Sequence, residues 1–184
     1  PLYLPENWTI NTHEGFGNYC LYQADLSVDA NENAAIWLLE NIFSTLEIPF
    51  VIAGKNPSKH LQEAAHRLQH TCIVANPEEK EMQDMITKAH VNILPSFSNS
   101  GIKLKLINAL FKGKHCVVNA ATVTGSGLEK LCHVADDIES MQKTIEQLFE
   151  QPYSISEIGM RMQLLQETFN NEKNAKQQVQ WIWG

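Results

Sequence analysis

The sequence has no excess of positive charge and no apolar run long enough to cross a membrane. Its 14 Lys and Arg residues against 21 Asp and Glu residues give a formal net charge of −7. A chain with this charge is not expected to bind nucleic acid or another polyanion over a broad surface. Nothing resembles a signal peptide, so the sequence predicts neither a transmembrane segment nor secretion. Any phosphate group must therefore be recognised locally, by backbone groups and one or two lysines.

Cysteine is also scarce, and the four cysteines form no close pair along the sequence. Cys20, Cys72, Cys116 and Cys132 each lie in or beside a predicted apolar strand. This spacing argues against zinc motifs and disulfide frameworks. We expect free thiols that serve as small core residues, which is compatible with a reducing, cytoplasmic location.

Three short patterns that would indicate a ligand site are incomplete. Residues 54–57 lack the length and the Ser or Thr of a phosphate-binding P-loop. Residues 124–127 carry two glycines, but Lys130 stands where a dinucleotide-binding turn needs a third. His66 and His70 share a predicted helix face, yet the acid of a zinc-protease helix is missing and a solvated polar face is favoured. The sequence therefore predicts no metal site.

What the chain does contain is a regular alternation of apolar strands and amphipathic helices. Its 184 residues, 43% of them hydrophobic, are enough for one domain with a sizeable core. Strands are predicted near residues 19–22, 50–53, 71–75, 91–94, 115–119 and 132–135, and the intervening helices at 32–46, from 58, from 76–79, at 101–112 and at 138–150. This order predicts an α/β fold, a Rossmann-like parallel sheet of about six strands flanked by helices.

The chain divides into three regions of different character. Residues 1–18 combine Pro and Gly with little periodicity and are interpreted as an interdomain linker or arm. Residues 19–150 hold the alternation and form the Rossmann-like domain. Residues 151–184 show helical spacing, for example at Ile155 and Leu165, and are expected to form extra C-terminal helices outside the sheet.

The ligand site is expected at the carboxyl ends of the parallel strands. Five predicted loops meet at that edge: 24–31, 54–58, 76–79, 96–101 and 119–127. The fourth leads into a helix whose free N–H groups and positive dipole end attract anions. The candidate contacts are Ser100, Gly101, Ile102, Lys103, Lys105 and Asn108. At helical spacing Gly101, Lys105 and Asn108 share one face of the predicted helix. A capped helix with solvated lysines explains the same residues equally well.

Residues 101–109 read Gly-Ile-Lys-Leu-Lys-Leu-Ile-Asn-Ala, and residues 113–118 follow as Gly-Lys and an apolar strand. This segment resembles the C-terminal, donor-binding half of GT-B fold glycosyltransferases and is closest to the "glycosyl transferases group 1" type. The order of elements between residues 19 and 149 also agrees with that family. The resemblance implies that the chain is one half of a GT-B fold.

The family implies a two-domain enzyme that transfers a sugar in polysaccharide or glycoconjugate synthesis. Its C-terminal half binds a nucleotide diphosphate sugar without a required metal or other cofactor. The acceptor, a glycan or lipid-linked glycan, binds the N-terminal half. A lipid-linked acceptor is compatible with peripheral contact between the enzyme and a membrane. Residues 151–184 would then pack on the domain or on the absent half, where Trp181 and Trp183 could dock, and the isolated chain is expected to be inactive.

The sequence departs from the family pattern at three positions. Two glutamates with seven residues between them are typical of the family, and Ser100 and Asn108 stand at the matching positions. Asn108 can still form hydrogen bonds to ribose hydroxyls, but without charge assistance. Asp25 aligns with a family arginine and would repel a diphosphate. These departures favour an alternative, a degenerate, non-catalytic nucleotide-binding or interaction module on the same fold; a flavodoxin-like protein is a third reading.

Overall fold

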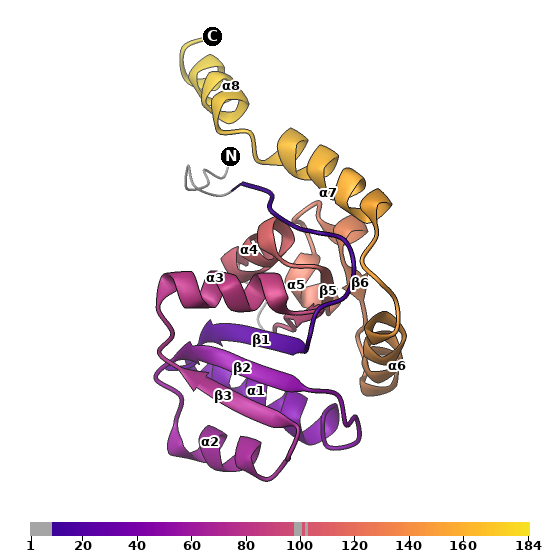
Figure 1. The fold of residues 1–184 in the computed structure, drawn as a ribbon. Helices are drawn as coiled ribbons and strands as arrows, with labels where there is room; N and C mark the ends of the chain where they lie inside the picture. Colours follow the sequence, from indigo (N-terminus) through magenta and orange to yellow (C-terminus); the bar gives the residue numbers. More distant parts are fainter. Residues whose placement is uncertain (1–8, 98–100, 102) are drawn as a thin grey trace.

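The protein is a six-stranded parallel sheet with helices on both faces (Figure 1). The computed structural model describes residues 9–97, 101 and 103–184. The strands are β1 (Cys20–Asp25), β2 (Phe50–Lys55), β3 (Thr71–Ala75), β4 (Val91–Ile93), β5 (His115–Val118) and β6 (His133–Val134). Their order across the sheet is β3-β2-β1-β4-β5-β6, with every pairing parallel. The order runs outward in both directions from β1 and β4, and confirms the predicted Rossmann-like sheet.

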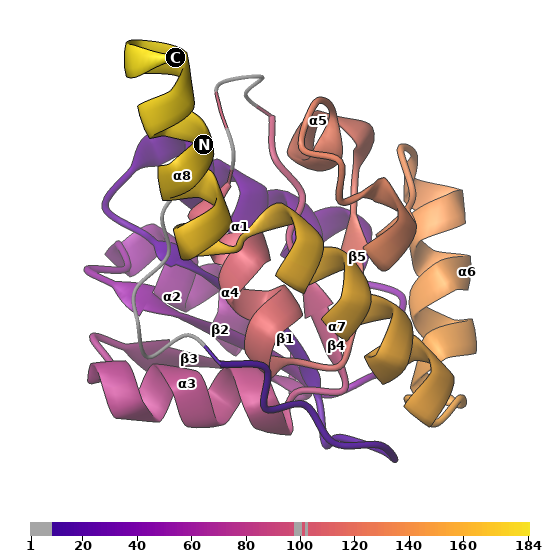
Figure 2. The same cartoon turned by 90° about the horizontal axis from the view of Figure 1, so that it is seen from above.

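Two groups of helices cover the two faces of the sheet. The helices are α1 (Asp29–Asn41), α2 (Lys59–His66), α3 (Glu79–Lys88), α4 (Leu104–Lys112), α5 (Ala120–Val123), α6 (Ile138–Phe149), α7 (Ile155–Thr168) and α8 (Asn171–Trp183), with a 3₁₀ turn at Glu129–Leu131. One hydrophobic cluster joins the sheet to α1, α2 and α6, and a second joins it to α3, α4, α5 and α7. Figures 1 and 2 show these two layers on either side of the strands.

Strand periodicity explains how one sheet supplies both cores. Successive side chains of a strand point to opposite faces, so Tyr22 packs in the first cluster and Leu21 in the second. A sheet buried on both faces needs apolar residues at consecutive positions, which is why the strands were visible as short apolar runs.

The start of α4 differs from its predicted position. The helix begins at Leu104 rather than at Gly101, after Lys103 in an extended conformation. Gly101 has a φ of +61°, a left-handed conformation that cannot continue a right-handed helix. Gly101 therefore does not share a helix face with Lys105 and Asn108, and that part of the prediction is wrong.

The C-terminal region forms two helices, as expected. Helix α7 begins with a capping box between Ser154 and Glu157, and Leu165 packs into the second core cluster. Helix α8 projects away from the sheet (Figure 1), and Trp181 and Trp183 are 66% and 83% exposed. No helix in the described part of the chain combines the length and apolar character that a bilayer crossing needs.

The described part of the N-terminal arm, from residue 9, runs along the amino ends of the strands. The Gly15 N–H donates to the Tyr153 carbonyl at 2.9 Å, and the Gly17 N–H donates to Nδ1 of the buried His90 at 3.0 Å. The arm is thus held by the segment between α6 and α7 and by the start of β4. Its role as an interdomain linker stays a prediction.

Candidate functional site

A cleft of about 810 Å³ opens at the carboxyl ends of β1 and β2, between the first turns of α1, α3 and α4. It lies beside the point where the strand order reverses, which is where open α/β sheets bind ligands. Its lining consists of Gln23, Ala24, Asp25, Asn31, Gly54, Lys55, Pro77, Glu79, Met82, Gln83, Lys103, Leu104, Lys105 and Asn108. Residues from three of the five predicted ligand loops, and three of the predicted contact residues, therefore meet in one cleft.

Lys105 is a positioned cation in this cleft. Its ammonium donates to the Tyr22 hydroxyl at 3.3 Å and to the Asn31 Oδ1 at 3.2 Å, and lies 4.9 Å from the centre of the Tyr22 ring. Burial, and to a lesser extent the charge of Lys103, lowers the pKa of Lys105 to about 8. The side chain is therefore mostly charged at neutral pH, and its neutral partners leave that charge available to an anion.

The first turn of α4 is fixed from the sheet side. Gln23 of β1 donates through Nε2 to the carbonyl of Lys105 at 3.1 Å. The Lys103 carbonyl accepts from the N–H of Leu106 and of Ile107, and no side chain caps the helix. The N–H groups of Leu104 and Lys105 precede these intrahelical bonds, so they are the orphan donors of the helix start. Donors of this kind favour an anion at the cleft.

Two amide side chains present unpaired acceptors in the cleft lining. The Asn108 Oδ1 and the Gln83 Oε1 are both buried, and neither has a hydrogen-bond partner among the described residues. Asn108 lies three residues after Lys105 on α4, on the same side of the helix. A buried acceptor without a partner costs free energy, which a ligand hydroxyl could recover by donating to it.

Asp25 adds negative charge at the mouth of the cleft. Its carboxylate is exposed and accepts from the Ser27 N–H at 3.1 Å and the Ser27 hydroxyl at 2.6 Å. These two hydrogen bonds, with a smaller contribution from the charge of Lys55, lower the pKa of Asp25. The charged residues of the lining are three lysines and two acids, Asp25 and Glu79. The cleft thus has a mixed field in which Lys105 is the most firmly positioned cation.

The other three predicted contacts are not among the lining residues of this cleft. Ser100 and Ile102 fall outside the described residues. Gly101 lines a neighbouring hollow of about 450 Å³, together with the loop at 120–126. Gly54 lines the cleft, and its backbone lies close to the neighbouring strand. A side chain at this position would overlap the Ala24 carbonyl, so only glycine fits.

Sequence reasoning missed the side chains that hold Lys105 in place. Tyr22 was interpreted only as a core residue, although its ring is buried while its hydroxyl reaches the cleft side of β1. Asn31 was included only as the last member of a loop. Both residues lie near the carboxyl end of the first strand, where parallel sheets bind ligands. That position could have identified them from the sequence.

The strand order defines a Rossmann-like fold, with a cleft at the carboxyl ends of its strands. Neither a protein-family model nor a curated protein sequence matches this chain. Several solved structures do resemble it, and they are GT-B glycosyltransferases. Their sequence identity to this chain is low, so the likeness concerns the fold.

Three of these structures illustrate the extent of the likeness. A variant of TarM from S. aureus, in complex with fondaparinux, α-GlcNAc-glycerol and UDP, covers 99% of this chain with a TM-score of 0.74 and 13% identity. An α,α-trehalose-phosphate synthase (UDP-forming) from Burkholderia xenovorans, in complex with glucose-6-phosphate, covers 83% with a TM-score of 0.63 and 12% identity. AviGT4, a glycosyltransferase involved in avilamycin A biosynthesis, covers 92% with a TM-score of 0.62 and 12% identity.

This chain spans only part of each of those proteins: 38% of TarM, 40% of the synthase and 53% of AviGT4. It has the fold of one Rossmann-like half of a GT-B glycosyltransferase.

Proposed function

We propose that the chain is the donor-binding half of a glycosyltransferase, which transfers a sugar from a nucleotide diphosphate sugar to an acceptor. The observation that carries this proposal is Lys105, a charged side chain held by neutral partners between the end of β1 and the start of α4. The fold of a GT-B half supports it, because one similar protein is described as UDP-forming and another was crystallised with UDP.

In the proposed mechanism, the diphosphate lies against the start of α4. Lys103, Lys105 and the first N–H groups of the helix bind the phosphate oxygens, with Ser100, Gly101 and Ile102 as further contacts. As the bond between sugar and phosphate breaks, negative charge grows on the departing diphosphate, and these fixed positive groups stabilise it. The proposed site supplies this charge from the protein and needs no metal.

The nucleoside extends from the phosphates along the cleft. Asn108 accepts from a ribose hydroxyl through the Oδ1 that has no partner in the described structure. The loop at 76–79 borders the base, since Pro77 and Glu79 line the same cleft. Asn108 is a positioning residue in this scheme because it contacts the ribose and not the bond that breaks.

Transfer to an acceptor requires a second half, which we propose binds the acceptor glycan or lipid-linked glycan. The exposed indoles of Trp181 and Trp183 on α8 are the proposed contact with that half. The chain described here is therefore expected to bind the donor but not to complete a transfer by itself.

The second candidate is a non-catalytic nucleotide-binding module with the same cleft. Asp25 favours it, because its exposed carboxylate at the mouth of the cleft opposes the negative charge that would grow on a departing diphosphate during transfer. The two candidates differ in chemistry and not in binding. Donor turnover by the chain together with its acceptor-binding half supports the enzyme, and tight binding without turnover supports the module.

The test is calorimetric titration of the chain with UDP, GDP, their sugars and inorganic pyrophosphate. Lys105→Ala should weaken the binding of all of them, since it removes a phosphate contact. Asn108→Ala should weaken nucleotide binding by about tenfold, a typical value for one hydrogen bond to a ligand, and leave pyrophosphate binding unchanged. Lys88→Ala, an exposed lysine at the far end of α3, is the matched control. Absence of binding to every nucleotide would rule out the donor-site proposal.

A further inference from the structure

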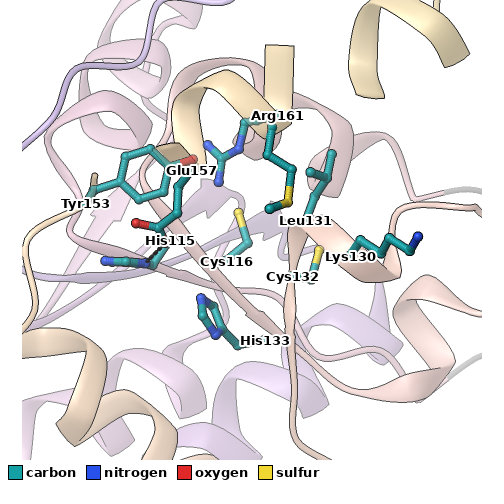
Figure 3. Close-up of a pocket in the computed structure, with 10 residues that line it drawn as sticks. His115, Cys116, Lys130, Leu131, Cys132, His133, Tyr153, Glu157 and Arg161 are labelled. Atoms are coloured by element: carbon teal, nitrogen blue, oxygen red, sulfur yellow. Dashed lines mark ion pairs between the residues drawn. The ribbon is translucent and has the colours of Figure 1, made fainter. Parts of the chain in front are cut away.

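A second cluster of chemically active side chains lies at the opposite edge of the sheet, where β5 and β6 begin. His115 and His133 are the first residues of those two strands, and Glu157 comes from the first turn of α7. They line a pocket of about 160 Å³ together with Cys116, Lys130, Leu131, Cys132, Tyr153, Met160 and Arg161 (Figure 3). The proposed donor cleft lies at the carboxyl ends of the strands, so the two sites are separate.

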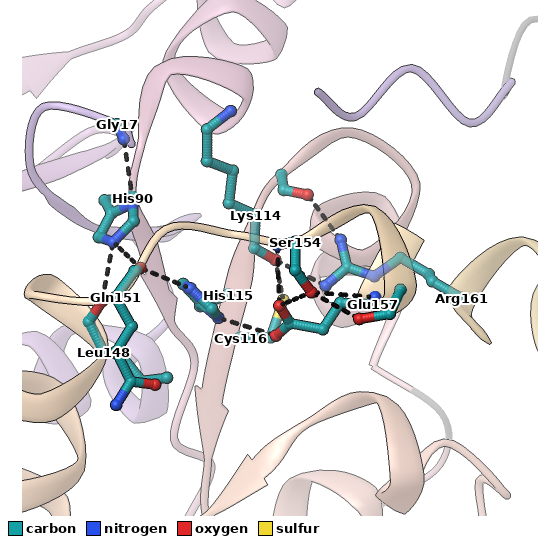
Figure 4. Close-up of polar contacts among 12 residues, drawn as sticks. Gly17, His90, Lys114, His115, Cys116, Leu148, Gln151, Ser154, Glu157 and Arg161 are labelled. Atoms are coloured by element: carbon teal, nitrogen blue, oxygen red, sulfur yellow. Dashed lines mark hydrogen bonds and ion pairs between the residues drawn. The ribbon is translucent and has the colours of Figure 1, made fainter. Parts of the chain in front are cut away.

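The carboxylate of Glu157 is oriented by its own helix cap. Its Oε2 accepts from the Ser154 N–H at 2.9 Å and the Ser154 hydroxyl at 2.6 Å (Figure 4). This leaves Oε1 directed at the His115 Nδ1, 3.4 Å away. Arg161 does not neutralise it, because its guanidinium donates to the carbonyls of Gly113 and Lys114.

Hydrogen bonding also decides which nitrogen of His115 carries the proton. The Nε2 lies 3.3 Å from the Gln151 carbonyl, which can only accept, so Nε2 is the protonated nitrogen. The Nδ1 of this ring, which is 2% exposed, has no hydrogen-bond partner among the described residues. In the neutral ring the Nδ1 lone pair therefore faces a carboxylate oxygen, and a cation between these two acceptors, either a proton or a metal ion, removes their repulsion.

We propose that His115, His133 and Glu157 bind a zinc ion. In a tetrahedral site with zinc–ligand distances of about 2.1 Å, neighbouring ligand atoms are separated by about 3.4 Å. The His115 Nδ1 and the Glu157 Oε1 have that separation, and all three candidate ligand atoms lie within 4.8 Å of one another. The His133 ring, 5.6 Å from that of His115 between centroids, supplies the third ligand nitrogen.

The ligand types select the metal. Two imidazoles and one carboxylate suit Zn²⁺, whereas Mg²⁺ and Ca²⁺ prefer sites built from oxygen. The groups that surround the proposed ligands also fit a metal site, because the Gln151 carbonyl orients His115 and Ser154 orients Glu157. The pocket leaves room for a water molecule as the fourth ligand.

The ion would join three elements of the fold, β5, β6 and α7. His115 and His133 come from the edge of the sheet, while Glu157 belongs to α7, which covers one face. The zinc ion therefore acts as a structural clamp that holds α7 against β5 and β6, and donor binding does not require it.

The experiment is a titration of the metal-stripped, tag-free chain with Zn²⁺, followed by calorimetry and thermal unfolding. A Cys72→Ser background removes the exposed thiol as a competing ligand. We expect one ion per chain and a melting temperature that rises by about 5 °C or more when Zn²⁺ is in hundredfold excess over its Kd. Co²⁺ in place of Zn²⁺ should give the visible absorption of a tetrahedral nitrogen and oxygen site.

Glu157→Gln and His133→Gln should each weaken Zn²⁺ binding by at least about tenfold. Glu157→Gln keeps an oxygen for the helix cap, and His133 makes no hydrogen bond that the fold needs among the described contacts, so both variants should fold. His66→Gln, an exposed histidine on α2, is the matched control and should bind as the parent does. Zn²⁺ binding that neither variant weakens, or the absence of binding at 1:1 stoichiometry, would overturn the proposal.

Discussion

The groups that contact the ammonium of Lys105 are neutral, so they do not cancel its positive charge. Among the described residues its ammonium contacts a phenol and an amide oxygen, and no carboxylate pairs with it. The free energy of holding this cation half-buried is unfavourable, which is why its pKa falls to about 8. A bound diphosphate would supply the missing negative charge and relieve that cost.

This gives a pH-dependent prediction for donor binding. The folded-state pKa of Lys105 is lowered, so the proton is lost from the free protein as the pH rises through about 8. If a diphosphate binds only the protonated form, its affinity should fall about tenfold between pH 7 and pH 9. Calorimetry with UDP at several pH values measures this change.

Lys105→Arg is the control for the pH prediction, because a guanidinium stays charged throughout this range. Its UDP affinity should be nearly independent of pH between 7 and 9. An equally steep loss of affinity in this variant would mean that another group is responsible.

Helix α7 depends on one buried arginine for its position. Arg161 donates to the Gly113 and Lys114 carbonyls at 2.6 Å each and stacks 4.8 Å from the centre of the Tyr153 ring. Both carbonyls belong to the segment that leads into β5. The planar fork of the guanidinium can reach both acceptors at once, whereas an ammonium cannot do so in the same geometry.

Arg161→Lys should therefore lower the free energy of unfolding by about 2 kcal/mol, because one of the two buried, charge-assisted hydrogen bonds is lost. The chain has one other arginine, the exposed Arg67, and Arg67→Lys should change stability by less than about 0.5 kcal/mol. Urea unfolding monitored by circular dichroism compares the two variants. Equal stability of both would show that α7 is held by its apolar contacts alone.

At the scale of the molecule, the largest group of exposed apolar side chains among the described residues lies on α8. Val179, Trp181, Ile182 and Trp183 are each more than half exposed and pack on no core cluster. Isolated exposed apolar residues are ordinary, but several on one terminal helix fit the proposed contact with an acceptor-binding half.

The double variant Trp181→Gln/Trp183→Gln should leave UDP affinity within about twofold and change the free energy of unfolding by less than about 1 kcal/mol. The physical reason is that neither indole is buried in this structure. The same variant should weaken association with the acceptor-binding half, which analytical ultracentrifugation of the two halves can measure. A large loss of stability in this chain alone would instead assign the indoles to its own fold.

Local pattern was a reliable guide to the elements and a poorer guide to their ends. The run at 71–75 matches β3 at both ends, because its apolar residues lie between polar turns. The predicted helix at 101–112 started too early, since helical spacing continues through residues that the backbone places before the helix. The spacing of apolar residues does not indicate that Gly101 adopts a left-handed backbone conformation.

The candidate sites depended on contacts between distant segments. Lys105 and Asn108 were predicted from the segment around α4, but Tyr22, Asn31 and Gln83, which complete the cleft, come from other elements. The side chains of the proposed zinc site come from β5, β6 and α7, and no spacing in the sequence links them.

The sequence by itself determined the alternation of strands and helices, since burial on both faces of a sheet requires apolar runs at regular intervals. It also placed a lysine-bearing helix start at the ligand edge. Only the tertiary structure decided that Lys105 is held by Tyr22 and Asn31, and that the His115 Nδ1 lies 3.4 Å from the Glu157 carboxylate. The reason is physical: the order in which strands join a sheet brings together residues that are far apart along the chain.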